Sequence, residues 1–183
     1  MIFFRQAQFY SNVVAVVSDG ARVVQAKFWP VLNTALFTIL VPGTVAVAIP
    51  QWLVGGFRQP ENGILRWLGV ICMACGAAVY SRCAWEFAVR GLGTPAPIAP
   101  TKFLVTTALH RFVRNPMYLG VALFILGEAA LFHSLHLVLY AAVMLSVAHV
   151  FVVLYEEPTL RRQFGASYEE YFRSVPRWVP KLR

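Results

Sequence analysis

The stretch VLNTALFTILVPGTVAVAIPQWLV, residues 31–54, decides the fold class. It contains no charged residue, and the charge-free region extends from Phe28 to Phe57. A bilayer core about 30 Å thick needs roughly 20 apolar residues in a helix, because lipid offers no hydrogen bonds to an exposed backbone. The stretch therefore predicts a membrane-spanning helix. Pro42-Gly43 in its middle predicts a kink rather than an end, since membrane helices tolerate such breaks.

Three further apolar stretches predict spans at about Ile64–Trp85, Met117–Phe132 and Leu137–Tyr155, with a reversal between the last two at residues 133–136. Residues 1–28 mix aromatic and Val residues with charges, which predicts an interfacial helix rather than a signal peptide or another span. The expected fold is an all-α polytopic membrane protein. It has about four transmembrane helices, an N-terminal interfacial helix and a cytoplasmic C-terminal segment.

Composition agrees with this interpretation. Of the 183 residues, 58% are hydrophobic and only 13% are charged, and the mean hydropathy is +0.62. These values exclude intrinsic disorder, and three scattered Cys argue against a disulfide-stapled fold. The net charge of +8 first suggests nucleic acid, yet fourteen of the sixteen Lys and Arg lie before the first span, from the end of the second to the start of the third, or after the fourth. The positive-inside rule therefore predicts that both termini and the central loop are cytoplasmic, with no nucleic-acid partner.

Two cytoplasmic segments differ from simple connecting loops. The first, residues 91–120, reads GLGTPAPIAPTKFLVTTALHRFVRNPMYLG, and the second, residues 155–180, reads YEEPTLRRQFGASYEEYFRSVPRWVP. On composition alone, the first could be a juxtamembrane segment that binds anionic head groups. The Glu156-Glu157 pair of the second could merely balance nearby arginines at helical spacing. A carboxylate at the membrane face could instead bind ribose hydroxyls or a ligand ammonium.

The combination of RNPMYLG with EEPTLRRQFGASYEEYFRSVPRW after one further hairpin resembles a known family. This family comprises the integral-membrane isoprenylcysteine carboxyl methyltransferases and phospholipid methyltransferases. The resemblance covers about residues 91–180, half of the chain. It implies S-adenosylmethionine as cofactor, bound in a cytoplasm-facing pocket, and a lipophilic acceptor that enters from the membrane. Residues 1–90 then carry the interfacial helix and two spans, and residues 91–183 the cofactor-binding region of one structural unit.

Carried over by position, the resemblance assigns cofactor-binding residues from three places in the chain. They are Thr107, Ala108, Leu109 and His110 before the motif, Arg114, Asn115 and Tyr118 within it, and Glu156 and Glu157 after the hairpin. Tyr118 and Trp178 are expected to line the adenine or the sulfonium, because aromatic faces attract cations. In the eukaryotic prenylcysteine enzymes, His stands in place of Asn115 and Tyr in place of His110. This chain has Val152 and Val153 near the position where those enzymes carry a substrate-binding Arg, which argues against a prenylcysteine carboxylate as acceptor.

Two residues are predicted to be catalytic. His110 is the candidate base for an acceptor that must lose a proton, and the alternative is a polar interfacial His without a catalytic role. Glu128 lies within a span, where a carboxylate is by default functional, so it is expected to line the pocket or to join helices. His149 could face the same pocket. Cys72 and Cys75 read as small packing residues rather than a redox or zinc pair, and no metal site is predicted.

Three functions remain open from the residues alone. The first is methyl transfer to a membrane-partitioned lipid amine, thiol or carboxylate. The second is an NADPH-dependent reduction, because the membrane sterol and steroid reductases share a similar R-[HN]-P-x-Y pattern. The third is a non-catalytic lipid-binding subunit. The bacterial character of the motif favours a bacterial inner membrane, and the small residues Gly69, Cys72 and Gly76 could form either an intrachain contact or a dimer interface.

Overall fold

The computed structural model describes residues 29, 31–56, 63–91 and 103–181, and the expected N-terminal interfacial helix lies outside them. Within these residues the fold is all-helical, as predicted, and contains no strand. The first span, Val31–Leu53, includes a π-helical segment η1 (Thr44–Ala48) and ends as α2 (Ile49–Leu53). The remaining elements follow in chain order: α3 (Ile64–Val89), η2 (Ala108–Arg111), α4 (Pro116–Leu131), α5 (Leu135–Phe151), η3 (Val152–Glu156), α6 (Glu157–Phe164) and α7 (Ala166–Ser174).

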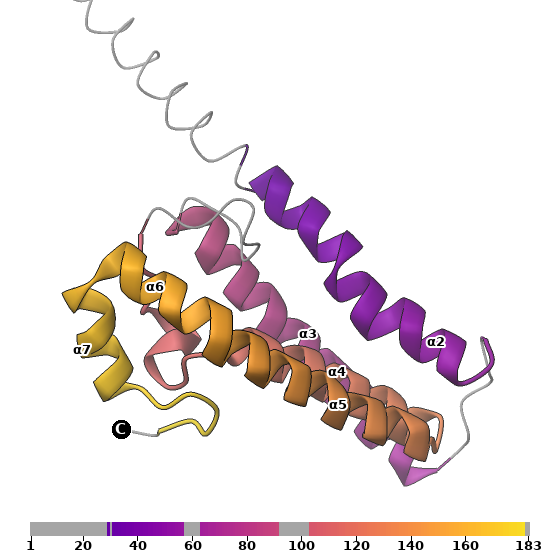
Figure 1. Ribbon diagram of the computed structural model, residues 1–183. Helices are drawn as coiled ribbons and strands as arrows, with labels where there is room; N and C mark the ends of the chain where they lie inside the picture. The colour runs from indigo at the N-terminus through magenta and orange to yellow at the C-terminus, as the bar shows by residue number, and fades with distance from the viewer. Residues whose placement is uncertain (1–28, 30, 57–62, 92–102, 182–183) are drawn as a thin grey trace, which may run out of the picture.

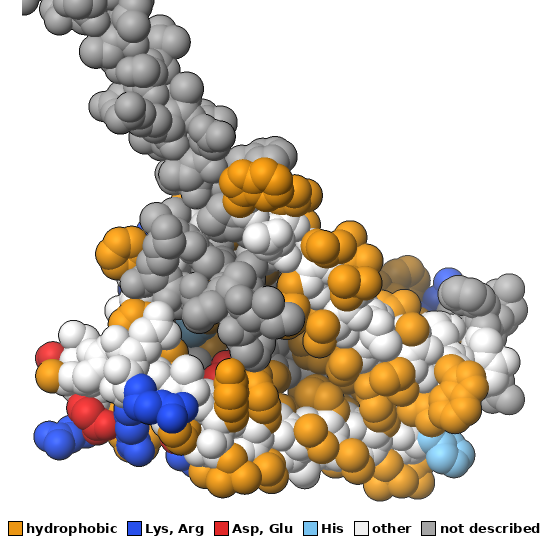
Figure 2. All heavy atoms as spheres, turned by 45° about the horizontal axis from the view of Figure 1, so that its top comes forward, with side chains coloured by type: hydrophobic (Ala, Val, Ile, Leu, Met, Phe, Trp, Pro, Cys, Tyr) orange, Lys and Arg blue, Asp and Glu red, His pale blue; other side chains and the backbone are white. Residues whose placement is uncertain are grey.

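The apolar helices α3, α4 and α5 pack along one another, and the first span contacts α4 and α5 through η1 and α2 (Figure 1). Three of them, Val31–Leu53, Ile64–Val89 and Leu135–Phe164, are long and apolar enough to cross a membrane, whereas α4 is shorter. With 16 residues, α4 is about 24 Å long at 1.5 Å per residue. The fourth helix continues from α5 through η3 into α6 and is therefore longer than the predicted Leu137–Tyr155. Hydrophobic side chains cover the middle of the surface, and most of the visible charged side chains gather over α6 and α7 (Figure 2).

Glycines determine how closely α3 and α4 approach. A Cβ added to Gly69 would lie 2.6 Å from the carbonyl oxygen of Gly127, and one added to Gly76 would lie 2.6 Å from that of Gly120. The residue number rises from Gly69 to Gly76 along α3 but falls from Gly127 to Gly120 along their partners in α4, so the two helices are antiparallel. The small residues of α3 therefore serve an intrachain contact. Cys72 and Cys75 are free thiols, and no cluster of metal-ligating side chains occurs among the described residues.

Both π-helical segments precede a proline by two residues. Ile49 N–H bonds to Thr44 O before Pro50, and Glu157 N–H bonds to Val152 O before Pro158. Proline has no N–H to continue the α-helical ladder, so the preceding turn widens while the helix goes on. At the expected disturbance the helix has a turn at Val41, and the helical residues Pro42 and Gly43 lie between this turn and η1. The second widened turn places Glu156 and Glu157 inside a continuous helix.

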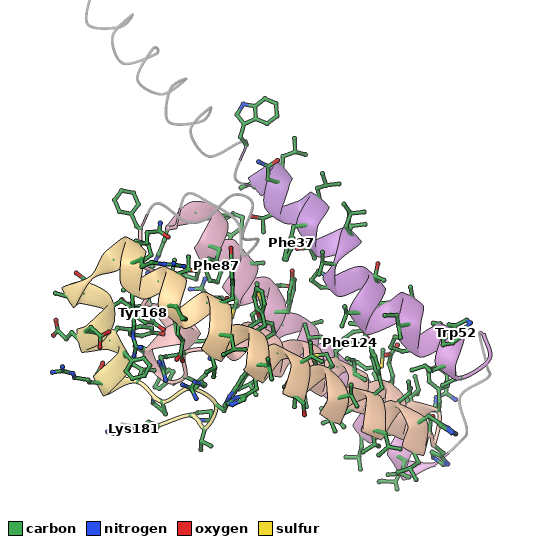
Figure 3. All side chains as sticks on the ribbon, viewed as in Figure 1. Phe37, Trp52, Phe87, Phe124, Tyr168 and Lys181 are labelled. Atoms are coloured by element: carbon green, nitrogen blue, oxygen red, sulfur yellow. The ribbon has the colours of Figure 1, made fainter. Side chains whose placement is uncertain are left out.

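The C-terminal elements fold back on the end of the bundle (Figure 1). α6 and α7 meet at Gly165, whose φ of 53° suits glycine. A small core of Tyr168, Tyr171 and Val175 holds them together. Residues 175–181 then return to the segment before α4: Arg114 N–H donates to Pro176 O at 2.9 Å, and Lys181 N–H donates to Phe112 O at 3.0 Å. Phe87, Tyr168 and Lys181 lie at this end, opposite Trp52 (Figure 3).

Candidate functional site

The two segments with unusual sequence meet at this end of the bundle. Besides the two backbone contacts just given, Asn115 Nδ2 donates to the carbonyl oxygen of Arg177 at 3.2 Å. Asn115 precedes Pro116, the first residue of α4, where a missing N–H costs nothing. The start of α4 is therefore tied to the C-terminal segment through its backbone and one side-chain amide.

Glu157 is the ionic centre of the contact. Its carboxylate accepts from Arg177 Nε at 2.7 Å and from Arg177 Nη2 at 2.9 Å, and Arg114 Nη1 lies 3.1 Å from Oε1. The Glu157 and Arg114 side chains are only 7% and 8% exposed, so this ion pair is largely shielded from water. Hydrogen bonding to Glu157 raises the pKa of Arg177. Among the described residues Arg114 Nε and Nη1 have no hydrogen-bond partner, so the 3.1 Å contact is an ion pair without hydrogen-bond geometry.

Glu156 faces a different neighbour. Tyr118 OH donates to its Oε2 at 3.4 Å, which is long for an O–H···O hydrogen bond. The Tyr118 ring meets Trp178 edge to face, with 6.2 Å between ring centroids, and Trp178 Nε1 donates to His149 Nδ1 at 2.9 Å. Tyr118, Glu156, Trp178 and His149 thus form an aromatic and acidic group, in which the Glu156 contact is weak enough for a ligand to replace.

The stretch from Thr107 to His110 is fixed between α3 and α7. The Thr107 hydroxyl donates to Glu86 Oε2 at 2.7 Å, and Tyr171 OH donates to His110 O at 2.7 Å. Ala108 has a φ of 52°, an uncommon value for a residue with a Cβ. The half-buried Ala108 and Leu109 form η2 together with His110 and Arg111.

His110 lies inside this arrangement. It is 4% exposed, and its ring meets Phe87 edge to face at 5.3 Å between centroids. Burial lowers the pKa of His110 to about 4, although Glu86 and the backbone of Thr107 act in the other direction. Its Nδ1 is buried without a hydrogen-bond partner among the described residues. At neutral pH the ring is therefore uncharged.

Glu128 is not brought to these residues. It follows Tyr118 by ten positions on α4, about 15 Å along the helix axis. It is 2% exposed, and its carboxyl group has a hydrogen bond with the side chain of Gln51 on α2. Its surroundings are those of a contact between two helices, which was one of the two roles expected for it.

Glu86 is a buried acid that sequence reasoning did not identify. It is 2% exposed and receives contacts from Arg82 at 2.5 Å and from Arg90 at 3.2 Å, in addition to Thr107. Arginines four residues before and after an acid at the end of a span are the signal that could have revealed it. The part played by Arg177 was also missed, because no spacing in the sequence pairs it with Glu157.

Comparison with known proteins decides between the families considered above. Residues 64–167 match the phospholipid methyltransferase family. The chain belongs to this family. Its members are membrane methyltransferases that use S-adenosylmethionine, which confirms the predicted resemblance and cofactor. With its apolar helices, the chain is a multi-pass integral membrane protein.

One relative is the methanethiol S-methyltransferase 2 of Bradyrhizobium diazoefficiens, which is 37% identical over 78 residues. The aligned part makes up 42% of this chain and 29% of that relative. The chain therefore matches less than a third of the length of this relative.

The residues at this end of the bundle fit S-adenosylmethionine chemically. The cofactor carries a carboxylate, an ammonium and a sulfonium. Arg114 has buried N–H groups without acceptors among the described residues, and Glu156 is an acid with one long hydrogen bond to Tyr118. The Tyr118 and Trp178 rings supply faces that attract a cation.

Proposed function

We propose that this protein transfers a methyl group from S-adenosylmethionine to a small thiol that partitions into the membrane. The observation that carries the proposal is the meeting of both motif segments at one end of an apolar bundle, tied together by Arg114, Glu157 and Arg177. When bound, the cofactor supplies a methyl group attached to a sulfonium. The transfer would form the bond from the methyl carbon to the thiol sulfur, break its bond to the sulfonium sulfur and release the thiol proton to solvent. Such a displacement needs alignment and a shielded site more than a strong acid.

Within this proposal Glu156 binds the ammonium or the ribose hydroxyls, and Arg114 contributes charge for the carboxylate. The rings of Tyr118 and Trp178 line the place of the sulfonium. A second wall of the site is formed by η2 and the residue before it, with the residues Thr107, Ala108, Leu109 and His110. Glu157 and Asn115 act by holding the C-terminal segment against α4. With a pKa of about 4, His110 is a weak base, so it serves as a neutral hydrogen-bond acceptor. For Glu128 we propose the interhelical role with Gln51.

The acceptor is proposed to be an uncharged small thiol for two reasons. The named activity of the Bradyrhizobium relative is methylation of methanethiol. In addition, a crevice of about 170 Å³ lies between the first span, α3 and α4 and has no charged side chain among its described lining residues. Its polar groups include the hydroxyls of Thr38 and Tyr80, which bond to each other at 2.9 Å. Such a crevice suits a small apolar molecule better than a phospholipid head group.

Both termini and the central loop are proposed to face the cytoplasm, because they and the adjoining end of α3 carry fourteen of the sixteen Lys and Arg. The cofactor site then opens to the compartment that supplies S-adenosylmethionine. Fusion of a fluorescent protein that matures only in the cytoplasm to Arg183 should give fluorescence, and fusion of alkaline phosphatase at His133 should give activity. The reverse pair of results contradicts the orientation.

The experiment for the activity uses the purified protein in detergent with methyl-labelled S-adenosylmethionine and methanethiol. We expect labelled dimethyl sulfide in the headspace. The amount of labelled dimethyl sulfide should fall at least about tenfold in Glu156→Gln, because this variant loses one charged contact with the cofactor. Glu169→Gln is the matched control, because it removes a surface ion pair with Arg161 by the same chemical change.

Three results, two from this labelling experiment and one from a thermal-shift measurement, contradict the proposal. Label in added phosphatidylethanolamine, with none in dimethyl sulfide, makes a lipid amine the acceptor. A thermal shift with NADPH and none with S-adenosylmethionine indicates a reductase. Cofactor binding without transfer to methanethiol or to any membrane extract indicates a non-catalytic lipid-binding subunit.

A further inference from the structure

Glu86 joins the long helix α3 to the stretch that the family resemblance assigns to the cofactor. Its carboxylate is 2% exposed and accepts the Thr107 hydroxyl at 2.7 Å, across 21 residues of sequence. Arg82 and Arg90, whose side chains are 48% and 57% exposed, flank the same carboxylate. A buried carboxylate is stable when paired and hydrogen-bonded, and here the hydrogen bond comes from Thr107, the residue directly before η2.

The backbone next to Thr107 requires such an anchor. Ala108 has a φ of 52°, which a residue with a Cβ adopts only where its surroundings impose it. The Glu86 contact fixes the residue before it, and the Tyr171 hydroxyl fixes the carbonyl of His110 two residues after it. Phe87, adjacent to Glu86, also packs on the His110 ring. The end of α3 therefore sets the conformation of residues 107–110.

We propose that Glu86 is a positioning residue for cofactor binding: it holds Thr107 and thereby the conformation of η2 in which residues 107–110 meet S-adenosylmethionine. This inference rests on the proposed function. Glu86 acts through Thr107 and does not itself touch the cofactor. Its loss should weaken cofactor binding and loosen η2, and the thermal stability of the helical bundle should change little because Arg82 and Arg90 are half exposed.

The test is a double-mutant cycle on the full chain in detergent, with the dissociation constant of S-adenosylhomocysteine measured by calorimetry. Glu86→Gln and Thr107→Val should each weaken binding by about tenfold, as expected for one hydrogen bond to a charged group. The double variant should be no weaker than either single variant. Thr107→Ser keeps the hydroxyl and should bind like the wild type, and Glu169→Gln serves as the control for loss of a carboxylate.

A second measurement, hydrogen exchange of the ligand-free protein, reports the positioning directly. In Glu86→Gln, peptides that cover residues 104–113 should exchange faster, whereas peptides that cover the middle of α3 and α4 should not change. Wild-type affinity in Glu86→Gln, or effects that add in the double variant, overturn the inference and leave the proposed function intact. Absence of S-adenosylhomocysteine binding by the wild type at millimolar ligand overturns the proposed function and this inference with it.

Discussion

Substitution of Glu157 by Gln should release the C-terminal segment from the bundle. The change removes the partner of the Arg114 guanidinium, whose side chain is 8% exposed, and of Arg177, which is 28% exposed. Breaking a buried pair by removing one partner costs about 3–5 kcal/mol, mostly because a buried charge is left without compensation. Arg177 can turn toward water, so most of the cost comes from Arg114.

Hydrogen exchange of the intact protein in detergent measures this cost locally. Because about 1.4 kcal/mol corresponds to a factor of ten, the amides of residues 166–181 should exchange about two to three and a half orders of magnitude faster in Glu157→Gln. Arg177→Gln leaves Glu157 paired with Arg114 and should accelerate the same amides by only about tenfold. Glu156→Gln, the matched neighbour, should leave them nearly unchanged.

The order of these three variants is what tests the reasoning. If Glu156→Gln accelerates exchange as much as Glu157→Gln, the two carboxylates do not have separate roles. If Glu157→Gln leaves residues 166–181 protected but abolishes S-adenosylhomocysteine binding, Glu157 is a ligand of the cofactor and not a structural anchor.

Three further predictions concern packing, pH and one buried hydroxyl. Gly76→Ala should lower the free energy of unfolding in detergent by about 1–3 kcal/mol, since the new Cβ would lie 2.6 Å from Gly120 O. Gly43→Ala is the control and should be neutral or stabilising, because its Cβ would lie 3.5 Å from the nearest atom. Because the pKa of His110 falls from 6.5 to about 4 on folding, the unfolded state binds more protons, so stability is complete above pH 6.5 and decreases by about 3 kcal/mol as the pH falls to about 4. Thermal unfolding of wild type and His110→Gln across this range should show a smaller decrease in the variant, and equal decreases would contradict the assignment. Tyr171→Phe leaves the His110 carbonyl without its 2.7 Å donor and should accelerate amide exchange around η2 by about tenfold, whereas unchanged exchange would mean that the hydroxyl does not hold η2.

The helical membrane fold could be predicted because its cause is local. Each apolar run must satisfy its own backbone in lipid, so the runs at residues 31–54 and 64–85 indicate helices without reference to any other part of the chain. The reversal near His133 is likewise present, and His133 itself adopts a φ of 47°. The resemblance of two short motifs then indicated the family and the region of the site.

What could not be predicted depends on contacts between distant residues. Glu86 and Thr107 are separated by 21 residues and Glu157 and Arg177 by 20, and neither pair has a helical spacing that periodicity can reveal. The bounds of α4, in contrast, were predicted to within one residue, since the helix runs from Pro116 to Leu131 and the expected span was Met117–Phe132. Glu128 was expected to be catalytic because it is an acid in a span, yet only the packing against α2 shows that Gln51 is its neighbour.

The geometry of a helix explains why the two motifs depend on each other. Adjacent helical residues do not face the same neighbour, so Glu156 and Glu157 necessarily point in different directions. Arg114 lies two residues before α4 and Tyr118 lies in its first turn. Each meets one of these acids: Arg114 meets Glu157, and Tyr118 meets Glu156. The widened turn before Pro158 lies in the helix that presents the acids. The segment 91–120 contains no acid, so Arg114 depends on Glu157 of the other segment. The ionic half of the contact stabilises the fold and leaves the weaker half for the ligand.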